Sequence, residues 1–340
     1  MRKVSIFAFV VALLAAGVSH TFPQQTVNCT ATVPTQVTVG VEVQFQGTAA
    51  LSGGGPGTLY DTDTIVGKLY RVNAGTFTQG VPSTEVGYSG EIQFQHTLTK
   101  NLAVMETEVT RQMWADLRAA QTLPVDPTCT GWGSGMTNPV QCVRWYEAVL
   151  FANQLSVQRG LGPVYFADAG FGTVINFTNY GSDSVYAKWD ANGYRLPTEG
   201  EWEYFARAGT TGPFSINEPA YSSSTYQSCT AGALAQLESV AWFCANAGST
   251  THPVGSKAAN PWGLKDVHGN VWEWCWDWWG SYPGSSQTDF RGALMGSVLV
   301  IRGGGWGDVP WGARSGVRSY SHPGYGGGYS VGFRLLRSVN

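Results

Sequence analysis

Two carboxylates seven residues apart form the first pattern in this sequence that could do chemistry. Asp266 and Glu273 flank Gly269, which lets the backbone turn sharply between them. Hard cations such as calcium bind several oxygens, which proteins supply as carboxylates and backbone carbonyls. The segment is therefore a candidate cation site, with a carboxylate pair that only hydrogen-bonds within a loop as the alternative.

Cysteines form the second pattern. The chain has six of them: Cys29, Cys129, Cys142, Cys229, Cys244 and Cys275. Two pairs each bracket a short loop and are candidate disulfides, although the other connectivities stay open: Cys129/Cys142 and Cys229/Cys244. No pair has the C-x-x-C spacing typical of structural zinc sites. Cys275 follows an aromatic run, which favours a buried thiol or a disulfide over a nucleophile.

The segment 307–330 has the composition of a recognition loop. It contains seven Gly, four Ser and three Tyr, and it lacks Lys, Glu, Gln and Met. In antibody paratopes Tyr supplies rigid amphipathic contact area, while Ser and Gly supply adaptable contacts. The composition therefore favours a surface that binds another molecule, with an ordinary glycine-rich loop as the alternative.

Short strands and helices must position these residues, and their patterns indicate an α+β architecture. Strands are predicted over residues 68–72, 75–77, 91–94 and 102–105, and helices over residues 111–117, 144–158 and 199–208. Thr198 and Glu201 have the spacing of a capping box at the start of the last helix. Beyond it the sequence predicts loops and short strands. The core is therefore expected to be irregular, mostly antiparallel β structure with a few short helices.

The N-terminus predicts export. A basic head and the apolar run from Val4 to Val18 are typical of a secretory signal peptide over residues 1–24. No other stretch is long and apolar enough to span a membrane. Residues 25–66 predict a small β-rich segment, and residues 67–340 the main domain. We therefore expect a periplasmic, cell-surface or extracellular protein, in a compartment where disulfides persist.

Composition limits the partners of the chain. The net charge is −3 and charged residues make up 13%, whereas a nucleic-acid-binding surface needs a basic stripe, so no nucleic-acid partner is expected. The 44 glycines and 14 tryptophans indicate a loop-rich domain that is held together by aromatic packing.

A series of motifs, in order along the chain, resembles the formylglycine-generating enzyme (sulfatase-modifying factor) family. The matching segments are residues 105–110, 138–140, 143–148, 194–203, 263–274, 302–306 and 332–334. Each segment alone is a weak signal, but their shared order is specific, and the resemblance covers the chain from Val66 to its C-terminus. It implies a C-type-lectin-like fold. It also implies a structural calcium ion, held by the side chains of Asp266 and Glu273 and the carbonyls of Gly269 and Val271.

The aromatic and basic residues of these motifs are expected to be structural. The tryptophans expected to anchor the core are Trp145, Trp202, Trp272 and Trp274. Planar guanidinium groups form bidentate pairs with carboxylates such as Glu201 and Glu203. The arginines expected to tie loops in this way are Arg195, Arg302 and Arg334.

The catalytic pair of the resembled enzymes is missing. In those enzymes two cysteines, five residues apart, bind copper(I) and convert a sulfatase cysteine to formylglycine, because soft copper(I) prefers sulfur ligands. Here Asp308 and, approximately, Ala313 occupy the corresponding positions, and no cysteine follows Cys275. We therefore expect no catalytic residues at these positions and no copper. The five histidines are scattered, which argues against the related iron-dependent sulfoxide synthases, whose site has three histidines.

Two functions follow from these observations. The first is an exported, non-catalytic protein that binds a protein or peptide ligand on its C-terminal surface. The second is a sulfatase-modifying oxidoreductase, or another enzyme of the same family with altered chemistry. Segment 307–330 also resembles the diversified region of diversity-generating-retroelement variable proteins, which is mutated at adenine-containing codons. The expected ligand-binding residues are Trp306, Asp308, Trp311, Arg314, Tyr320, His322, Tyr325 and Tyr329.

Overall fold

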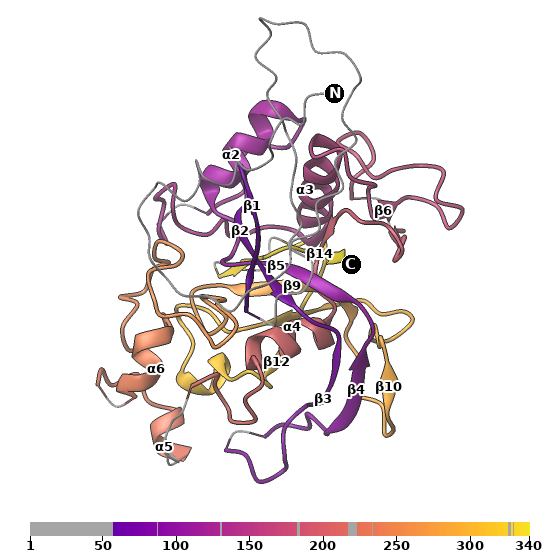
Figure 1. Cartoon of the computed structure of the whole chain (residues 1–340). Helices are drawn as coiled ribbons and strands as arrows, with labels where there is room; N and C mark the ends of the chain where they lie inside the picture. The colour runs from indigo at the N-terminus through magenta and orange to yellow at the C-terminus, as the bar shows by residue number, and fades with distance from the viewer. Residues whose placement is uncertain are drawn as a thin grey trace, which may run out of the picture. The chain divides into compact units, whose positions relative to one another are not determined.

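The computed structural model describes the second of two units in the chain. The described residues are 57–86, 88–129, 131–181, 184–216, 223–232, 234–325, 328 and 330–340. The expected signal peptide over residues 1–24 lies outside the described residues, as do residues 25–56, which include Cys29, and also Tyr329. Figure 1 shows the course of the chain from β1 to the C-terminus.

A five-stranded antiparallel sheet joins the first and last described segments. Its strands, in spatial order, are β1 (Leu59–Asp63), β2 (Gly67–Val72), β5 (Asn101–Met105), β14 (Leu336–Val339) and β8 (Tyr194–Arg195). Neighbouring strands are antiparallel throughout. Because β14 lies between β5 and β8, the C-terminus is part of this sheet. β1 lies within the expected β-rich segment 25–66, and it pairs with β2 in the same sheet.

A four-stranded sheet carries the motif-rich segments. Its spatial order is β12 (Arg318–Ser321), β11 (Leu299–Arg302), β9 (Trp272–Trp278) and β13 (Val331–Gly332). β11 is antiparallel to both of its neighbours, whereas β13 runs parallel to β9. β12 and β13 are the two edge strands of this sheet.

Smaller elements complete the fold. A three-stranded sheet contains β3 (Gly75–Gln79), β4 (Phe94–Leu98) and β10 (Gln287–Thr288), and a two-stranded sheet contains β6 (Tyr165–Phe166) and β7 (Tyr186–Ala187).

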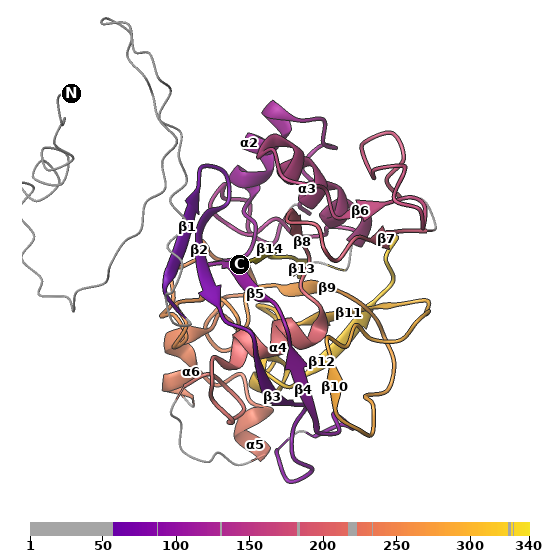
Figure 2. The ribbon, with the colours of Figure 1, turned by 45° about the vertical axis from the view of Figure 1, so that its right-hand side comes forward.

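The helices are α2 (Arg111–Ala120), α3 (Trp145–Gln158), α4 (Glu199–Arg207), α5 (Ser223–Tyr226), α6 (Ala235–Val240) and the 3₁₀ helix η1 (Pro310–Ala313). Figures 1 and 2 show α2 with α3 at one end and α5 with α6 at the other. The predicted α+β architecture is confirmed.

Local sequence signals determine where α4 begins. The Thr198 hydroxyl accepts from the Glu201 N–H at 3.2 Å, and Glu201 accepts from the Thr198 N–H at 2.8 Å, so the predicted capping box is confirmed. The strand predicted over residues 91–94 was wrong in position, because β4 begins only at Phe94. The Glu91 carboxylate instead accepts from the N–H and hydroxyl of Ser89, which holds this segment in a turn.

Large aromatic side chains fill the core. Trp202 and Trp274 are fully buried and Trp145 is nearly so, as predicted. Trp272 is only partly buried, and it packs against the edge of the core cluster that contains Trp145 and Trp274. Its indole Nε1–H donates to the carboxylate of Asp308, which draws the side chain toward the candidate ligand-binding surface.

Buried ion pairs connect the motifs. Arg195 forms a bidentate pair with Glu201 at 2.6 and 2.7 Å, as the sequence predicts. Two further motif arginines also bind carboxylates: Arg302 pairs with Glu203, and Arg334 pairs with Glu273. Both of these pairs are fully buried, so each charge depends on its partner for compensation.

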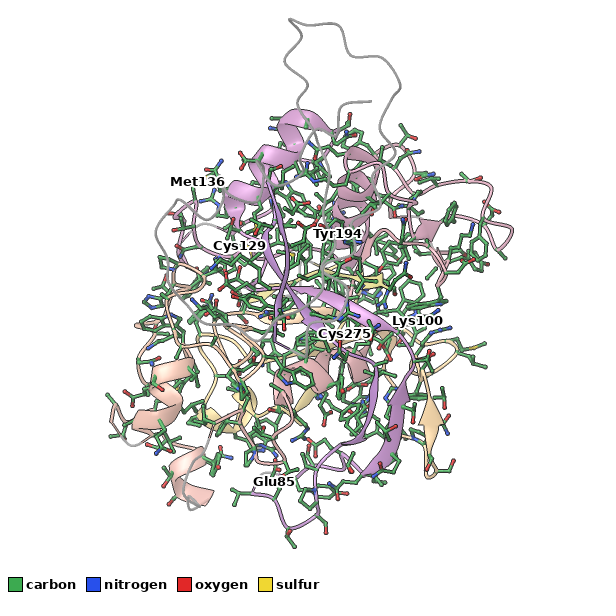
Figure 3. All side chains as sticks on the ribbon, viewed as in Figure 1. Glu85, Lys100, Cys129, Met136, Tyr194 and Cys275 are labelled. Carbon is green, nitrogen blue, oxygen red and sulfur yellow. A yellow bond between two sulfur atoms is a disulfide. The ribbon has the colours of Figure 1, made fainter. Side chains whose placement is uncertain are left out.

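Both predicted disulfides are present. They join Cys129 to Cys142 and Cys229 to Cys244. Cys275 is the free cysteine of the described part of the chain; it is fully buried, and burial raises the pKa of its thiol, so it is the inert core thiol that the sequence favoured. Figure 3 labels Cys129 and Cys275 among the side chains. Among the described residues, no helix has both the length and the hydropathy to cross a membrane.

Candidate ligand-binding surface

The turn after β11 places the first candidate residues. Gly303 and Gly304 have φ of +99° and +77°, and a Cβ on Gly304 would lie 2.8 Å from the Gly312 carbonyl oxygen, so the turn requires glycine there. The chain then reaches Trp306, whose N–H donates to the Asn270 carbonyl at 2.8 Å. The Trp306 ring stacks on Trp132, with ring centroids 5.2 Å apart and planes at 19°.

Asp308 is a fixed acceptor rather than a mobile surface carboxylate. Its Oδ2 accepts from the Trp272 indole at 2.7 Å and from the Gly305 N–H at 2.8 Å, and its backbone carbonyl accepts from the Cys244 N–H at 3.0 Å. Burial raises the pKa of the Asp308 carboxyl, and the two hydrogen bonds offset part of that rise. The side chain therefore combines a defined position with a reduced tendency to ionise.

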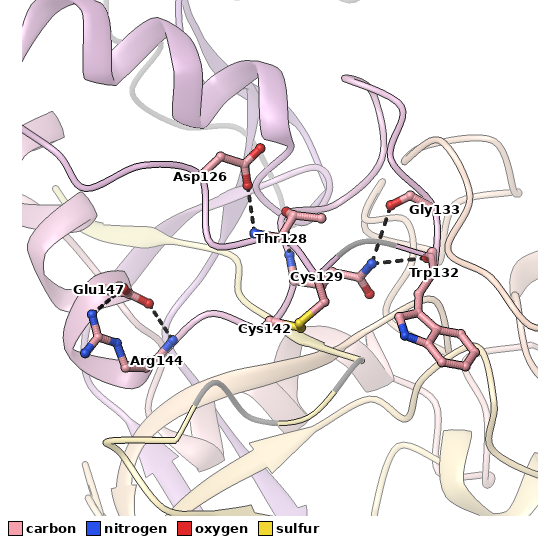
Figure 4. Close-up of a disulfide and its surroundings, with 9 residues drawn as sticks. Asp126, Thr128, Cys129, Trp132, Gly133, Cys142, Arg144 and Glu147 are labelled. Atoms are coloured by element: carbon pink, nitrogen blue, oxygen red, sulfur yellow. Dashed lines mark hydrogen bonds and ion pairs between the residues drawn. A yellow bond between two sulfur atoms is a disulfide. The ribbon is translucent and has the colours of Figure 1, made fainter.

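The two disulfides each support one part of this surface. The loop closed by Cys129–Cys142 carries Trp132 (Figure 4). The Trp132 carbonyl accepts from the Gln141 side chain at 3.1 Å and from the Thr251 N–H at 3.0 Å. The Cys229–Cys244 disulfide fixes the residue that donates to Asp308. Both cross-links thus fix loops that contact the Trp306–Asp308 turn.

Trp311 and Arg314 lie around η1 in a different environment. Arg314 is fully buried, forms an ion pair with Glu85 and lies 4.0 Å from Glu91. Its guanidinium also lies over the half-buried Trp311 ring, 5.6 Å from the centroid. Arg314 is therefore a core residue in this structure, and a ligand could reach it only after the loop carrying Glu85 moves.

The other described candidates, Tyr320, His322 and Tyr325, are exposed. Tyr320 is 55% exposed on the edge strand β12, and its ring packs on Trp279 at 4.9 Å. His322 and Tyr325 are exposed, with ring centroids 4.9 Å apart. The structure thus brings Trp306 and Asp308 together, but it places the other candidates in separate groups.

Two residues of the site were missed by sequence reasoning. Trp132 stacks on Trp306, and Trp272 binds Asp308, yet neither was expected to contact a ligand. The predicted disulfide loop around Trp132 was the available signal, because a cross-linked loop with a large aromatic residue is pre-organised for binding.

Neither position that corresponds to a catalytic cysteine of the resembled enzymes has a thiol. Asp308 is held as described, and Ala313 is fully buried with its carbonyl accepting from His268 Nδ1 at 2.8 Å. That contact requires the proton on Nδ1, so Nε2 accepts from the Ser215 N–H at 3.0 Å. Burial lowers the pKa of His268 to about 4, so this neutral tautomer fixes the loop around Ala313.

The expected calcium ligands lie in a buried acidic loop. Both carboxylate oxygens of Glu273 accept from Arg334, and Oε2 also accepts from the Trp202 indole at 2.8 Å. Asp266 Oδ2 accepts from the Gly255 N–H at 2.6 Å, whereas the buried Oδ1 has no hydrogen-bond partner within the described part of the chain. Burial raises the pKa of Asp266 to about 6.

A third carboxylate, Glu108, lies beside this loop, and its oxygens accept from the Asn270 side chain and the Val271 N–H. Even so, the described residues contain no group of three or more His, Cys, Asp or Glu side chains arranged to hold a metal ion. The calcium site, including the carbonyls of Gly269 and Val271, stays a prediction. Glu273 could join a cation only by giving up part of its pairing with Arg334.

Residues 60–339 match the family described as the sulfatase-modifying factor enzyme 1-like domain. The chain belongs to this family. It is 31% identical over 222 residues to the chaperone protein LppX of Paenibacillus barcinonensis, covering 58% of this chain and 67% of the chaperone. It is also 35% identical over 127 residues to the formylglycine-generating enzyme of Streptomyces coelicolor, covering 36% of this chain and 38% of that enzyme. The chain covers only 29% of Pkn1, a serine/threonine-protein kinase of Chlamydia caviae.

Solved structures of this family share the fold. Treponema denticola variable protein 1 is 30% identical, with a TM-score of 0.67, and the match covers 82% of this chain and 99% of that protein. PvdO from Pseudomonas aeruginosa is 26% identical, with a TM-score of 0.62, and the match covers 84% of this chain and all of that protein. The expected C-type-lectin-like fold of the formylglycine-generating-enzyme type is thereby confirmed.

Proposed function

We propose that this chain is an exported, non-catalytic ligand-binding protein on a formylglycine-generating-enzyme scaffold. Its recognition surface consists of the Trp306–Asp308 turn with Trp132 and Trp272, together with the exposed aromatic residues of segment 307–330. The likeness to Treponema denticola variable protein 1 over most of both chains supports this proposal. The disulfides Cys129–Cys142 and Cys229–Cys244 support export, because such bonds persist in oxidising compartments.

The proposal that the chain is not catalytic rests on the missing copper-binding cysteines. No cysteine follows Cys275, and Asp308 stands where the resembled enzymes have the first copper-binding thiolate. The Asp308 carboxylate is already bound by the Trp272 indole and the Gly305 N–H. A hydrogen-bonded carboxylate is a hard ligand and does not replace the soft sulfur that copper(I) requires.

The proposed ligand is a protein or peptide. Stacked aromatic rings offer a large contact area at little cost in side-chain entropy, while the Gly- and Ser-rich backbone of segment 307–330 adapts to the partner. The Trp132–Trp306 stack is the best-supported anchor, since its loops are held by a disulfide and by backbone hydrogen bonds. Such fixed aromatic anchors commonly dominate interface energies.

A direct assay distinguishes this function from an oxidase of the same family. The purified chain would be incubated with copper(I), oxygen and a cysteine-containing sulfatase peptide, and formylglycine would be measured by mass spectrometry. We expect no conversion by the wild type. Copper-dependent conversion would favour the sulfatase-modifying oxidoreductase and reject this proposal.

Binding itself is tested with the aromatic surface. Immobilised wild type should retain a protein or peptide from a surface extract of the producing cells, and Trp306→Ala should lose that retention because the stack on Trp132 is removed. The matched variant Trp189→Ala changes a partly buried tryptophan outside the recognition surface and should retain the partner. Equal retention by Trp306→Ala and wild type would exclude this turn as the binding surface.

A further inference from the structure

A separate pocket of 340 Å³ opens beside β3 and α4. These two elements contact each other, and β3 lies next to α4 in Figure 1. None of the eight residues expected to bind a ligand lines this pocket. Its volume falls at the small end of the range of about 300–1,000 Å³ found for small-molecule sites. The pocket is therefore large enough for one ring-sized ligand.

Three aromatic rings form an apolar wall of the pocket. Tyr204 lies between the other two, with its ring centroid 5.0 Å from Phe77 and 5.0 Å from Trp262. The Tyr204–Trp262 pair is nearly edge-to-face at 73°, and all three side chains are only half-buried. Edge-to-face packing holds the rings in place and leaves part of their surface open to a ligand.

Hydroxyl and amide groups form the rim. The Thr78 hydroxyl accepts from the Gln95 side chain at 2.7 Å, so its own hydrogen remains available to donate. Gln93 and Thr211 also line the opening. Across the described part of the chain, no hydrogen bond involves the side chains of Gln93 or Thr211 or the Tyr204 hydroxyl. A ligand could therefore hydrogen-bond to these groups without breaking an existing hydrogen bond.

The pocket has no uncompensated charge. Arg207 is the ionised side chain in its lining, and each of its three nitrogens already has a partner. Its Nε donates to Glu203 at 2.9 Å, and its terminal nitrogens donate to the carbonyls of Gly212 and Gly80 at 3.0 and 3.1 Å. A charged ligand would be desolvated here without an opposite charge to meet it, so the pocket selects against anions and cations.

We propose that this pocket binds a neutral, hydroxyl-rich ring, namely a hexose residue of a glycan. The apolar C–H face of the sugar would pack on Tyr204 and Trp262, and its hydroxyls would reach the Tyr204 hydroxyl and the Thr78, Gln93 and Thr211 side chains. An aromatic wall, an uncharged polar rim and the small volume all match this chemistry. The proposal does not depend on the C-terminal recognition surface.

The test uses the purified full chain and the methyl glycosides of glucose, galactose, mannose and N-acetylglucosamine. Saturation-transfer NMR identifies binding, and titration calorimetry gives the affinity. We expect at least one glycoside to bind with a millimolar Kd, and the corresponding uronic acid to bind more weakly because of its charge. Tyr204→Phe keeps the ring and removes only the hydroxyl, so it should weaken binding about tenfold.

Tyr186→Phe is the matched control, because it makes the same chemical change on an exposed tyrosine outside both the pocket and the recognition surface. It should bind the glycoside like the wild type. Thermal unfolding of both variants should match the wild type, since the Tyr204 hydroxyl has no partner to lose. Absence of binding for all four glycosides at about 20 mM, more than ten times the expected Kd, would overturn the proposal. Equal affinities of the two variants, or binding of a hydroxyl-free ring such as indole in preference to every sugar, would also overturn it.

Discussion

The buried ion pairs and the C-terminal surface use polar and aromatic groups in opposite ways. Around Arg334 every donor nitrogen has an acceptor, and the Glu273 carboxylate is bound on both oxygens. Along segment 307–330, Tyr320 and Tyr325 project into solvent. This fold therefore separates stability from recognition: the buried charges depend on their partners, whereas the exposed tyrosines can change without opening the core.

The largest expected effect comes from breaking a buried pair. Arg334→Met should leave Glu273 charged and uncompensated in the core, which costs about 3–5 kcal/mol of unfolding free energy. The matched change Arg337→Met, on β14, affects a longer and less buried pair, 3.9 Å from Asp61, and should cost roughly 1 kcal/mol or less. Urea denaturation of both variants measures the difference. Equal costs would mean that burial does not distinguish these pairs.

The same contrast explains which parts of the structure the sequence could predict. The capping box of Thr198 with Glu201 and the disulfide of Cys129 with Cys142 join residues close in sequence, so their spacing was sufficient evidence. Motif order was enough to imply the fold, because the motifs include β8 and parts of β5, β9, β11 and β13, together with arginines whose ion pairs connect distant segments.

Long-range partners could not be predicted in this way. Arg314 is buried and forms an ion pair with Glu85, which lies 229 positions away. Nothing in the composition of the C-terminal segment distinguishes this arginine from an exposed one. The Trp132–Trp306 stack likewise joins distant loops. Only the tertiary path of the chain assigns Arg314 to the core and Trp132 to the candidate site.

A second test of the buried network uses pH. His96 is fully buried, with Nδ1 2.7 Å from the Gln79 side-chain oxygen and Nε2 accepting from the Phe290 N–H, so it is neutral with its proton on Nδ1. Burial is the main cause that lowers the pKa of His96, and the nearby carboxylates offset only part of it. As the pH falls, His96 in the unfolded chain therefore takes up a proton near pH 6.5, whereas His96 in the folded chain does so only at a lower pH.

The sign of the effect follows from this order of protonation. The contribution of His96 to stability is complete above about pH 6.5 and is lost as the pH falls toward its folded pKa. His96→Gln should cost about 1–3 kcal/mol at pH 8 because buried partners lose their hydrogen bonds, and this cost should shrink at pH 5. His322→Gln, on the exposed surface, should show no such change. A cost for His96→Gln that is independent of pH, measured by denaturation at both values, would contradict this assignment.

Removal of calcium by a chelator tests whether a bound ion stabilises the acidic loop that contains Asp266 and Glu273. A calcium ion that binds only the folded state at about ten times its Kd would add about 1.4 kcal/mol, so EDTA should lower the Tm. Asp266→Asn should weaken that response, because Asp266 Oδ1 is the buried carboxylate oxygen without a partner. Glu273→Gln should weaken it too, but it should also destabilise the chelated protein by disturbing the pair with Arg334. Identical melting curves with and without EDTA would remove the calcium site.

The smallest effect on stability is expected at the C-terminal surface. Tyr320 is 55% exposed and Tyr325 71% exposed, so replacing both with Ser removes little buried area and should change the unfolding free energy by about 0.5 kcal/mol or less. The core change Trp274→Ala removes a fully buried ring and should cost about 3–5 kcal/mol. Thermal unfolding of the two variants in parallel compares these two losses of stability directly. If the tyrosine variant unfolds as readily as the tryptophan variant, segment 307–330 supports the core, and the separation of recognition from stability is wrong.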